Sequence, residues 1–200
     1  MAITNGYCTL AEVKAALKII DNIDDATLEM AVEAASREID GYTNRYFYNA
    51  GTATKYFEAQ DNYVTDLEDL QSVTTLATST EADMVFDTTW DTTDFQLEPV
   101  NGRSGGIVTP YTSVRAIGRY IFPVWNHMTL VKVVGVWGWA SVPIAVKQAC
   151  IIQASRIFKR LDSPLGVAGF GDMGVMRVSN RIDPDVAQLL DPYRTLRNFA

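Results

Sequence analysis

The residue types best suited to chemistry are few and scattered in this 200-residue chain. His127 is the only histidine. One chain therefore cannot build a histidine-based metal cluster or a Ser-His-Asp triad, which need histidine as ligand or base. A structural role for His127 is favoured over a catalytic one.

Two further patterns resemble ligand sites only in part. Asp87, Asp91 and Asp94 lack the one-three-five spacing, central glycine and distal glutamate of a calcium loop. Residues 166–171 have the glycines of a phosphate loop, but they follow a predicted helix and no Gly-Lys-Ser/Thr comes after them. The sequence therefore predicts no catalytic centre, no metal site and no cofactor.

The two cysteines, Cys8 and Cys150, lie far apart in the sequence. The favoured interpretation is a pair of buried, reduced thiols in a cytosolic protein, with a disulfide as the alternative.

Charge is distributed unevenly along the chain, whose net charge is −7. Eleven acidic residues and no Lys or Arg lie between Tyr56 and Gly102, whereas 8 of the 17 basic residues lie from Lys147 onward. An acidic block is poorly suited to binding phosphate backbones. It would suit a surface over which DNA slides, and the alternative is that these acids keep an exposed sheet soluble.

Composition indicates a globular protein, with 48% hydrophobic and 20% charged residues. No apolar run approaches the roughly 18–20 residues that a membrane span needs, and the N-terminus lacks a signal-peptide pattern. We therefore expect no contact with a membrane, and either one domain or a domain with a large insertion.

Both ends of the chain carry helix signals. Thr9 and Glu12 fit a capping box, and a second helix is expected from Asp24 or Asp25, with Gly41 in it as a point of close approach. Apolar residues at helical spacing follow Pro143 and run to Leu161, and Asp183 with Pro184 starts a final helix. Ile151 and Ile152 lie off the main apolar stripe, so we expect this helix to be buried on several sides or to meet a neighbouring subunit.

The middle of the chain changes to the period of strands. Short runs rich in β-branched and aromatic residues occur at residues 54–58, 73–78, 84–86 and 95–98, and residues 130–139 form the longest strand candidate. Asn-Gly and Ser-Gly-Gly mark turns near residues 101–106. The sequence thus predicts an α+β fold, in which residues 1–49 and 140–200 form a helical bundle and residues 50–139 are an inserted, acidic, mostly antiparallel β-rich region.

Several segments at the two helical ends resemble those of head–tail connector (adaptor, or head-completion) proteins of tailed bacteriophages. They are YCTLAEVK at residues 7–14, EAASREID at 33–40, RYFY at 45–48, VP at 142–143, AVKQA at 145–149, RIFKR at 156–160, DSPLG at 162–166, and the end of the chain from Asp185-Val186 to Tyr193-Arg194. The resemblance covers about half of the chain and does not include the acidic middle.

The resemblance implies a structural virion protein of the neck, assembled in the host cytoplasm. Such proteins form a ring, usually of about twelve copies, under the portal protein, where they extend the DNA channel and receive stopper or tail-completion proteins. DNA passes without sequence-specific binding. An enzyme is the least favoured class, and another neck or tail protein (a tail terminator, stopper or decoration protein) is the main alternative.

The charge and apolar patterns described above, set against the ring that the resemblance implies, suggest roles for particular residues. A C-terminal arm for docking to the portal would contain Arg177, Arg181, Tyr193, Arg194, Arg197 and Phe199. A subunit interface or loop would contain Ile151, Ile152, Ser163, Pro164, Leu165, Gly166 and Phe170. Acids that face the channel or avoid DNA would be Asp87, Asp91 and Asp94.

Overall fold

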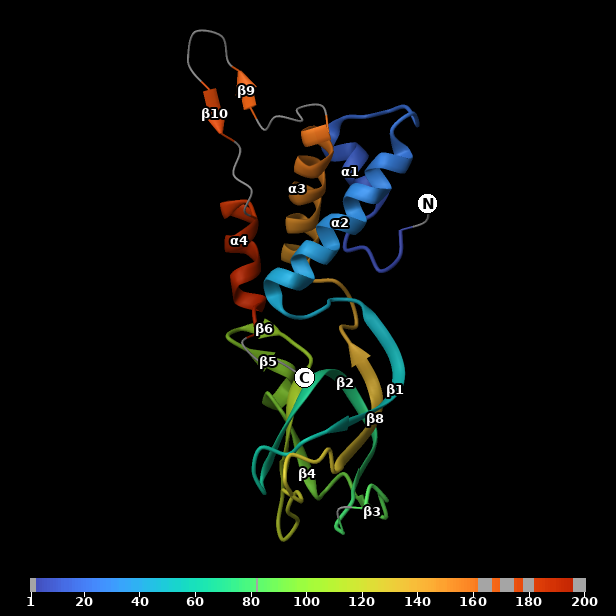
Figure 1. Cartoon of the computed structure of the whole chain (residues 1–200), viewed down its shortest axis with the longest axis vertical. Coiled ribbons are helices and arrows are strands. Elements are labelled where there is room, and N and C mark those ends of the chain that lie inside the picture. Colours follow the sequence, from blue (N-terminus) through green and yellow to red (C-terminus); the bar gives the residue numbers. More distant parts are fainter. Residues whose placement is uncertain (1–2, 82, 162–166, 170–174, 178–181, 196–200) are drawn as a thin grey trace. The chain divides into compact units, whose positions relative to one another are not determined.

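The computed structural model describes residues 3–81, 83–161, 167–169, 175–177 and 182–195. These residues form two compact units, and each has its own core. The helical unit combines the described residues up to Tyr48 with those from Val142 onward, and the sheet unit consists of the described residues from Asn49 to Ser141. The chain thus contains helices and a mostly antiparallel sheet, which confirms the predicted α+β class (Figure 1).

The helical unit begins with α1 (Leu10–Leu17) and α2 (Asp25–Thr43). The predicted capping box at α1 is present, because the Thr9 side chain accepts from the Glu12 backbone while the Glu12 side chain accepts from the Thr9 backbone. Helix α2 ends where Asn44 takes a left-handed conformation.

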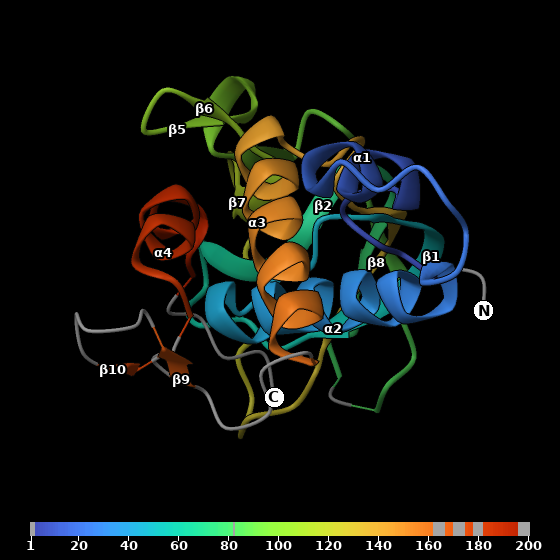
Figure 2. The same ribbon diagram turned by 90° about the horizontal axis from the view of Figure 1, so that it is seen from above.

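Helices from the end of the chain complete this unit. They are α3 (Ile144–Leu161), α4 (Pro184–Leu190) and the short 3-10 helix η3 (Asp191–Tyr193), and α4 has the expected Asp183 cap. Helix α3 packs on α1, α2 and α4 (Figure 2). The strands β9 (Val167–Gly169) and β10 (Val175–Arg177) pair with each other. The fully buried side chains between these helices include Val13, Leu28, Val32, Ile39, Phe47, Val146, Cys150, Val186 and Leu190.

The sheet unit is a six-stranded antiparallel sheet in the order β1-β8-β2-β7-β4, with β3 paired to β2. Its strands are β1 (Asn49–Phe57), β2 (Val64–Thr78), β3 (Thr88–Trp90), β4 (Phe95–Glu98), β7 (Tyr111–Ala116) and β8 (Val131–Gly138). The short 3-10 helix η1 (Val100–Gly102) and the hairpin of β5 (Arg103–Ser104) and β6 (Ile107–Val108) occupy the expected turn region.

The longest strand is β2, with 15 residues, whereas the candidate at residues 130–139 is the eight-residue β8. The first part of β2 pairs with β7 and its second part pairs with β8, with register irregularities around Leu70. The expected strand at residues 84–86 is wrong, because Met84 has a left-handed conformation (φ 64°) that ends strand pairing there. Strand β7 was missed altogether.

The core of the sheet unit is rich in aromatic side chains. A glycine in β8 lets the neighbouring strand approach it, since a Cβ at Gly135 would lie 2.3 Å from the Ser72 carbonyl oxygen. The buried core residues are Phe57, Leu67, Leu70, Leu76, Trp90, Phe95, Val114, Phe122, Val131, Val133 and Trp137.

Candidate functional site

The lone histidine lies on the surface of the sheet unit. His127 is 89% exposed, and its Nδ1 lies 2.6 Å from the Glu58 carboxylate. The part of the chain that the structure describes has no group of three or more His, Cys, Asp or Glu side chains placed to hold a metal ion. Among the described helices, none is long and apolar enough to cross a membrane.

The three loop acids lie in the sheet unit near β3. Asp87 and Asp91 are exposed, and Asp94 is partly buried. The Asp94 carboxylate accepts a hydrogen bond from the Asp91 backbone at 2.8 Å, while the Asp94 backbone N–H donates to the Asp91 carbonyl at 2.9 Å. Asp94 therefore stabilises its own turn, and Asp87 and Asp91 have the more accessible carboxylates.

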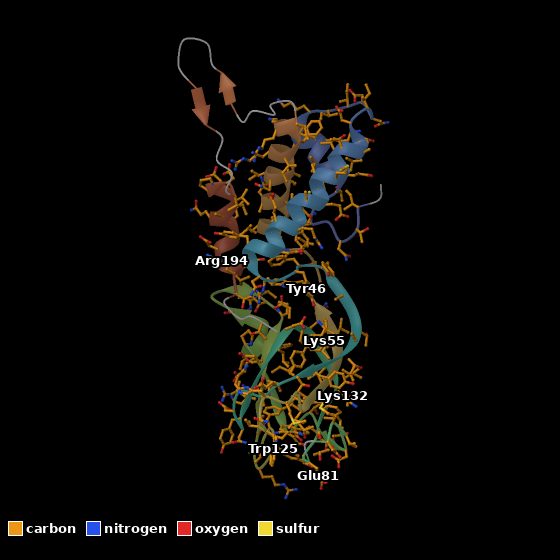
Figure 3. The ribbon with its side chains drawn as sticks, in the orientation of Figure 1. Tyr46, Lys55, Glu81, Trp125, Lys132 and Arg194 are labelled. Atoms are coloured by element: carbon orange, nitrogen blue, oxygen red, sulfur yellow. The ribbon has the colours of Figure 1, made fainter. Side chains whose placement is uncertain are left out.

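Three loops meet at one end of the sheet unit: those between β1 and β2, between β2 and β3, and between β7 and β8. Main-chain hydrogen bonds join them: Phe122 N–H donates to the Asn62 carbonyl, Ala116 N–H to Tyr63, and Ser79 N–H to Leu130. Trp125 and Glu81 lie at this end (Figure 3). We call the exposed apolar side chains of these loops the loop-end surface: Tyr63, Met84, Val85, Ile117, Ile121, Val124 and Trp125.

An exposed apolar surface of this kind commonly marks a contact with another protein. Acidic side chains lie in the same loops, among them Glu81, Asp83 and Asp87. The loop-end surface was not predicted, because its members come from three separate loops and each alone is an ordinary surface residue.

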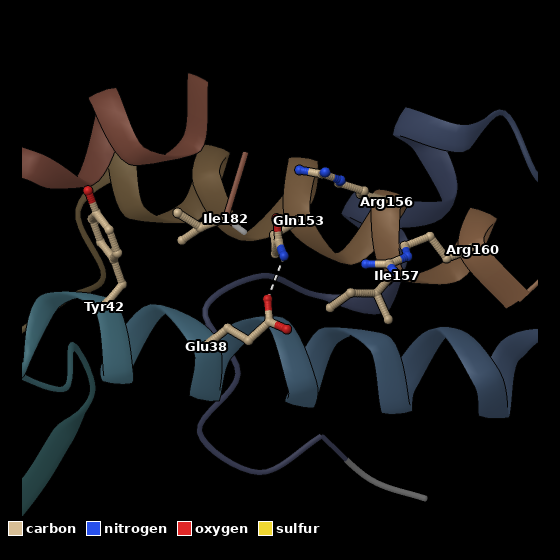
Figure 4. A pocket seen from close by; sticks show the side chains of 7 residues that line it. All are labelled: Glu38, Tyr42, Gln153, Arg156, Ile157, Arg160 and Ile182. Carbon is tan, nitrogen blue, oxygen red and sulfur yellow. Dashed lines mark hydrogen bonds between the residues drawn. The ribbon is translucent and has the colours of Figure 1, made fainter. Parts of the chain in front are cut away.

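The helical unit contains a groove, lined mainly by α2 and α3, with a volume of about 440 Å³ (Figure 4). Volumes of this size are typical of sites that take a ligand or an anchoring side chain. The lining side chains are Glu38, Tyr42, Gln153, Arg156, Ile157, Arg160 and Ile182.

One polar atom in this groove lacks a hydrogen-bond partner. Gln153 is buried, and its amide nitrogen donates to the Glu38 carboxylate. Its carbonyl oxygen Oε1 is buried without a hydrogen-bond partner in the described structure. An unsatisfied buried acceptor costs free energy that a donor from a binding partner would recover.

Charged side chains surround Gln153. Arg156 Nη1 lies 3.1 Å from Asp183, which also caps α4. Tyr42 donates to the Asp191 carboxylate at 2.6 Å, and this bond raises the pKa of the Tyr42 hydroxyl. The groove is thus bordered by the Arg156–Asp183 ion pair and the Tyr42–Asp191 hydrogen bond, and it contains the apolar side chains of Ile157 and Ile182.

The residues expected to form the portal-docking arm do not lie together on one described segment. Tyr193 is buried and its ring packs edge-on against Phe47, at 5.8 Å between centroids, so it holds the helical unit together instead of projecting from it. The Arg194 guanidinium lies over the Tyr42 ring at 4.9 Å. Arg177 belongs to β10, and Arg181, Arg197 and Phe199 lie outside the described residues.

The expected interface on α3 is described only in part. Ile151 and Ile152 are both partly buried within the helical unit. The loop members Ser163, Pro164, Leu165, Gly166 and Phe170 lie outside the described residues.

The groove itself was missed by sequence reasoning, although Gln153 carried a signal. It is the polar member of the apolar stripe on α3, and a polar side chain on a core stripe needs a partner. Glu38 and Tyr42, which line the groove from α2, carried no such signal, since a single sequence does not show which helices pack together.

Comparisons with known proteins agree with this fold. Residues 7–82 match the family model of the phage gp6-like head-tail connector protein. The resemblance expected from the sequence is therefore confirmed for this part of the chain. No curated protein matches the sequence.

Two solved structures share the fold over the whole chain. One is from the neck of an empty GTA particle computed with C6 symmetry, with 18% identity, a TM-score of 0.58, and coverage of 100% of this chain and 95% of the other. The second is from the neck of a native GTA particle computed with C12 symmetry, with 20% identity, a TM-score of 0.56, and coverage of 100% and 94%. At these identities the likeness shows a shared fold.

Proposed function

We propose that this chain is a structural subunit of the neck of a phage-like particle, where it forms the head–tail connector. The observation that carries this proposal is the match of residues 7–82 to the connector family. The fold shared with neck proteins over the full chain supports it independently. The described side chains offer surfaces for assembly and no metal-binding cluster.

In this proposal about twelve copies form a ring under the portal protein, through which DNA passes without sequence-specific contacts. The C12 symmetry applied to one of the similar necks supports this number. The test is electron microscopy of the purified chain with and without the portal protein of its particle. We expect a ring with a central hole that stacks coaxially on the portal, and a monomer that does not bind the portal would contradict the proposal.

We further propose that the helical unit is the connector core and that the end of the chain docks to the portal. Deleting residues 181–200 is unsuitable as a test, because it removes α4, whose Val186 and Leu190 are buried. Deleting residues 196–200 removes Arg197 and Phe199 and keeps the Thr195 N–H bonded to the Thr43 carbonyl. We expect this truncation to weaken portal binding while the circular dichroism spectrum stays unchanged. Unaltered binding would exclude Arg197 and Phe199 from the arm.

The acidic middle of the chain is proposed to keep DNA from adhering in the channel. Asp87 and Asp91 are suitable for charge reversal, whereas reversing Asp94 would break its turn. Particles that carry Asp87→Lys and Asp91→Lys should eject DNA more slowly than wild-type particles. An unchanged ejection rate would leave these acids with a role in solubility only.

The alternative role is that of another neck or tail protein, such as a stopper, tail terminator or decoration protein. The loop-end surface favours contact with a further protein, so it suits a stopper as well as a connector. The same micrographs separate the two roles, because a stopper would bind a preformed connector ring and would not bind the portal directly.

A further inference from the structure

The two cysteines, 142 positions apart in the sequence, meet in the core of the helical unit. Their Sγ atoms are 3.2 Å apart, and both are free thiols with buried side chains. Cys8 precedes α1, and Cys150 lies in the first half of α3. Packing has therefore placed two oxidisable groups side by side as free thiols, where the sequence favoured reduced thiols and left a disulfide as the alternative.

The surroundings give the two sulfur atoms different roles. The Cys8 thiol donates to Cys150 Sγ, and the Ser36 hydroxyl lies 3.5 Å from the same sulfur. The hydrogen bond that the Cys8 thiol donates lowers the pKa of the Cys150 thiol, although burial acts in the opposite direction. The pKa of the Cys8 thiol is raised, because it donates to Cys150 and is buried. Cys150 is thus the better nucleophile of the pair.

We propose that Cys8 and Cys150 are a redox pair that closes to an intramolecular disulfide in oxidising surroundings and fastens the N-terminal segment to α3. An S–S bond is about 2.0 Å long, so the two sulfur atoms must approach each other by about 1 Å. The reduced pair is the form present in a reducing cytosol.

The oxidant that the reaction needs is a small disulfide of the glutathione type. The Cys150 thiolate attacks one sulfur of this oxidant, whose S–S bond breaks and releases one thiolate. Cys8 then gives up its proton and attacks Cys150 Sγ, which forms the protein disulfide and releases the second thiolate. Two electrons pass to the oxidant, and the two protons lost by the cysteines appear on the two released thiols.

The oxidant reaches the thiols when the N-terminal segment opens. Residues 3–8 lie outside the helices, and their polar contacts include those of Thr4 N–H with the Glu33 carboxylate and of Tyr7 N–H with Ser36 Oγ. Local opening of such a segment needs less free energy than global unfolding. After closure, the disulfide prevents this opening and joins the two ends of the chain within one unit.

The biological role of this disulfide rests on the proposed function. A subunit made in the cytosol assembles as the dithiol, and a particle released into oxidising surroundings acquires the bond. The bond would then strengthen a neck that no longer has to rearrange during assembly.

The test begins with the purified, reduced chain incubated with oxidised glutathione. We expect the loss of both thiols in a dithionitrobenzoate assay after denaturation, a mass lower by two hydrogen atoms, and a peptide that links Cys8 to Cys150. The melting temperature should rise by roughly 10 °C, and dithiothreitol should reverse this rise.

The matched control is Cys8→Ala, in which Cys150 can form only a mixed disulfide with glutathione, so we expect no peptide that links positions 8 and 150 and no rise in melting temperature. Two results would show that the pair does not close in the folded chain. In the first, the native wild-type chain keeps both thiols while the same chain in urea oxidises; in the second, the native wild-type chain forms only intermolecular disulfides. Formation of the Cys8–Cys150 disulfide without a change in melting temperature would show that the bond does not hold the N-terminal segment on α3. Ring formation and portal binding of Cys8→Ala are measured in separate experiments. A chain that forms no ring would therefore contradict the proposed function without changing the result for the disulfide.

Discussion

At the scale of single residues, two glycines show how packing decides what a position tolerates. Gly41 lies exposed in α2, and in the described part of the chain no atom of a neighbouring element lies within 4 Å of a Cβ placed there, so the expected close approach at this residue is wrong. Gly135 lies in β8, where a Cβ would meet the Ser72 carbonyl oxygen at 2.3 Å. The same residue type is thus dispensable in one place and necessary in the other.

Gly41→Ala should stabilise the chain by up to about 1 kcal/mol, because alanine has less backbone freedom to lose on helix formation. The measurement is the free energy of unfolding from urea titration. Gly135→Ala is the matched control and should destabilise the chain, since its methyl group has no space. Equal effects of the two substitutions would contradict this account.

At the scale of elements, one ion pair joins the first helix to the third. Lys147 Nζ on α3 lies 2.9 Å from the Glu12 carboxylate on α1. The hydrogen bond from Lys147, with further bonds at Thr9, lowers the pKa of Glu12 below its ordinary value of 4.5. Because the pKa is lower in the folded state, the stabilisation is complete above pH 4.5 and is lost as the pH falls through the folded pKa.

Glu12→Gln tests this link, since glutamine keeps the capping box but loses the charge. At neutral pH the wild type should have a higher urea midpoint than the variant, and the difference should disappear in acid. High salt should reduce the difference at neutral pH, because the pair is partly exposed. In a Lys147→Gln background the substitution should have a smaller effect. A difference independent of pH would exclude the ion pair as its cause.

A second element-scale feature is the loop between β7 and β8. Phe122 is fully buried and stacks on Trp90 at 4.6 Å between ring centroids, which holds this loop on the sheet. Phe122→Ala should destabilise the chain by about 3–5 kcal/mol and expose the loop to trypsin at Arg119. Ile121→Ala, at an exposed neighbour, is the control and should leave both the stability and the cleavage rate unchanged. Equal cleavage of the two variants would show that Phe122 does not hold the loop.

At the scale of the whole molecule, a ring requires two different faces of each subunit to meet. The groove on the helical unit is a candidate for one face, because the unpaired Gln153 oxygen suits a segment that brings a donor, and Arg160 adds positive charge to the lining of the groove. A neighbouring copy can supply such a segment, since acidic residues outnumber basic ones in this chain.

Arg160→Glu should therefore weaken ring formation at least tenfold, measured by analytical ultracentrifugation or by counting rings in micrographs. Lys159→Glu is the matched control, because it changes the charge identically at an exposed position that does not line the groove. If both variants assemble as the wild type does, the groove is not a subunit interface.

The features that the sequence by itself determined are local ones. The capping box at Thr9 and Glu12, the Asp183 cap before Pro184 and the turn at residues 101–106 depend on contacts within a few residues, so their signals are readable in one chain. The alternation of strand residues likewise predicted a mostly antiparallel sheet. The resemblance to connector proteins also came from short local segments, and the family match confirms it for residues 7–82.

Only the tertiary structure decided which distant residues meet. Strand β2 changes partner along its length, Gln153 comes to lie beside Glu38, and Asp69, counted in the acidic block, is buried with Trp139 donating to it. Cys8 and Cys150 came into contact in the same way. Such contacts depend on the packing of elements far apart in the chain, and the free energy of packing is shared among many residues. No local pattern therefore records them.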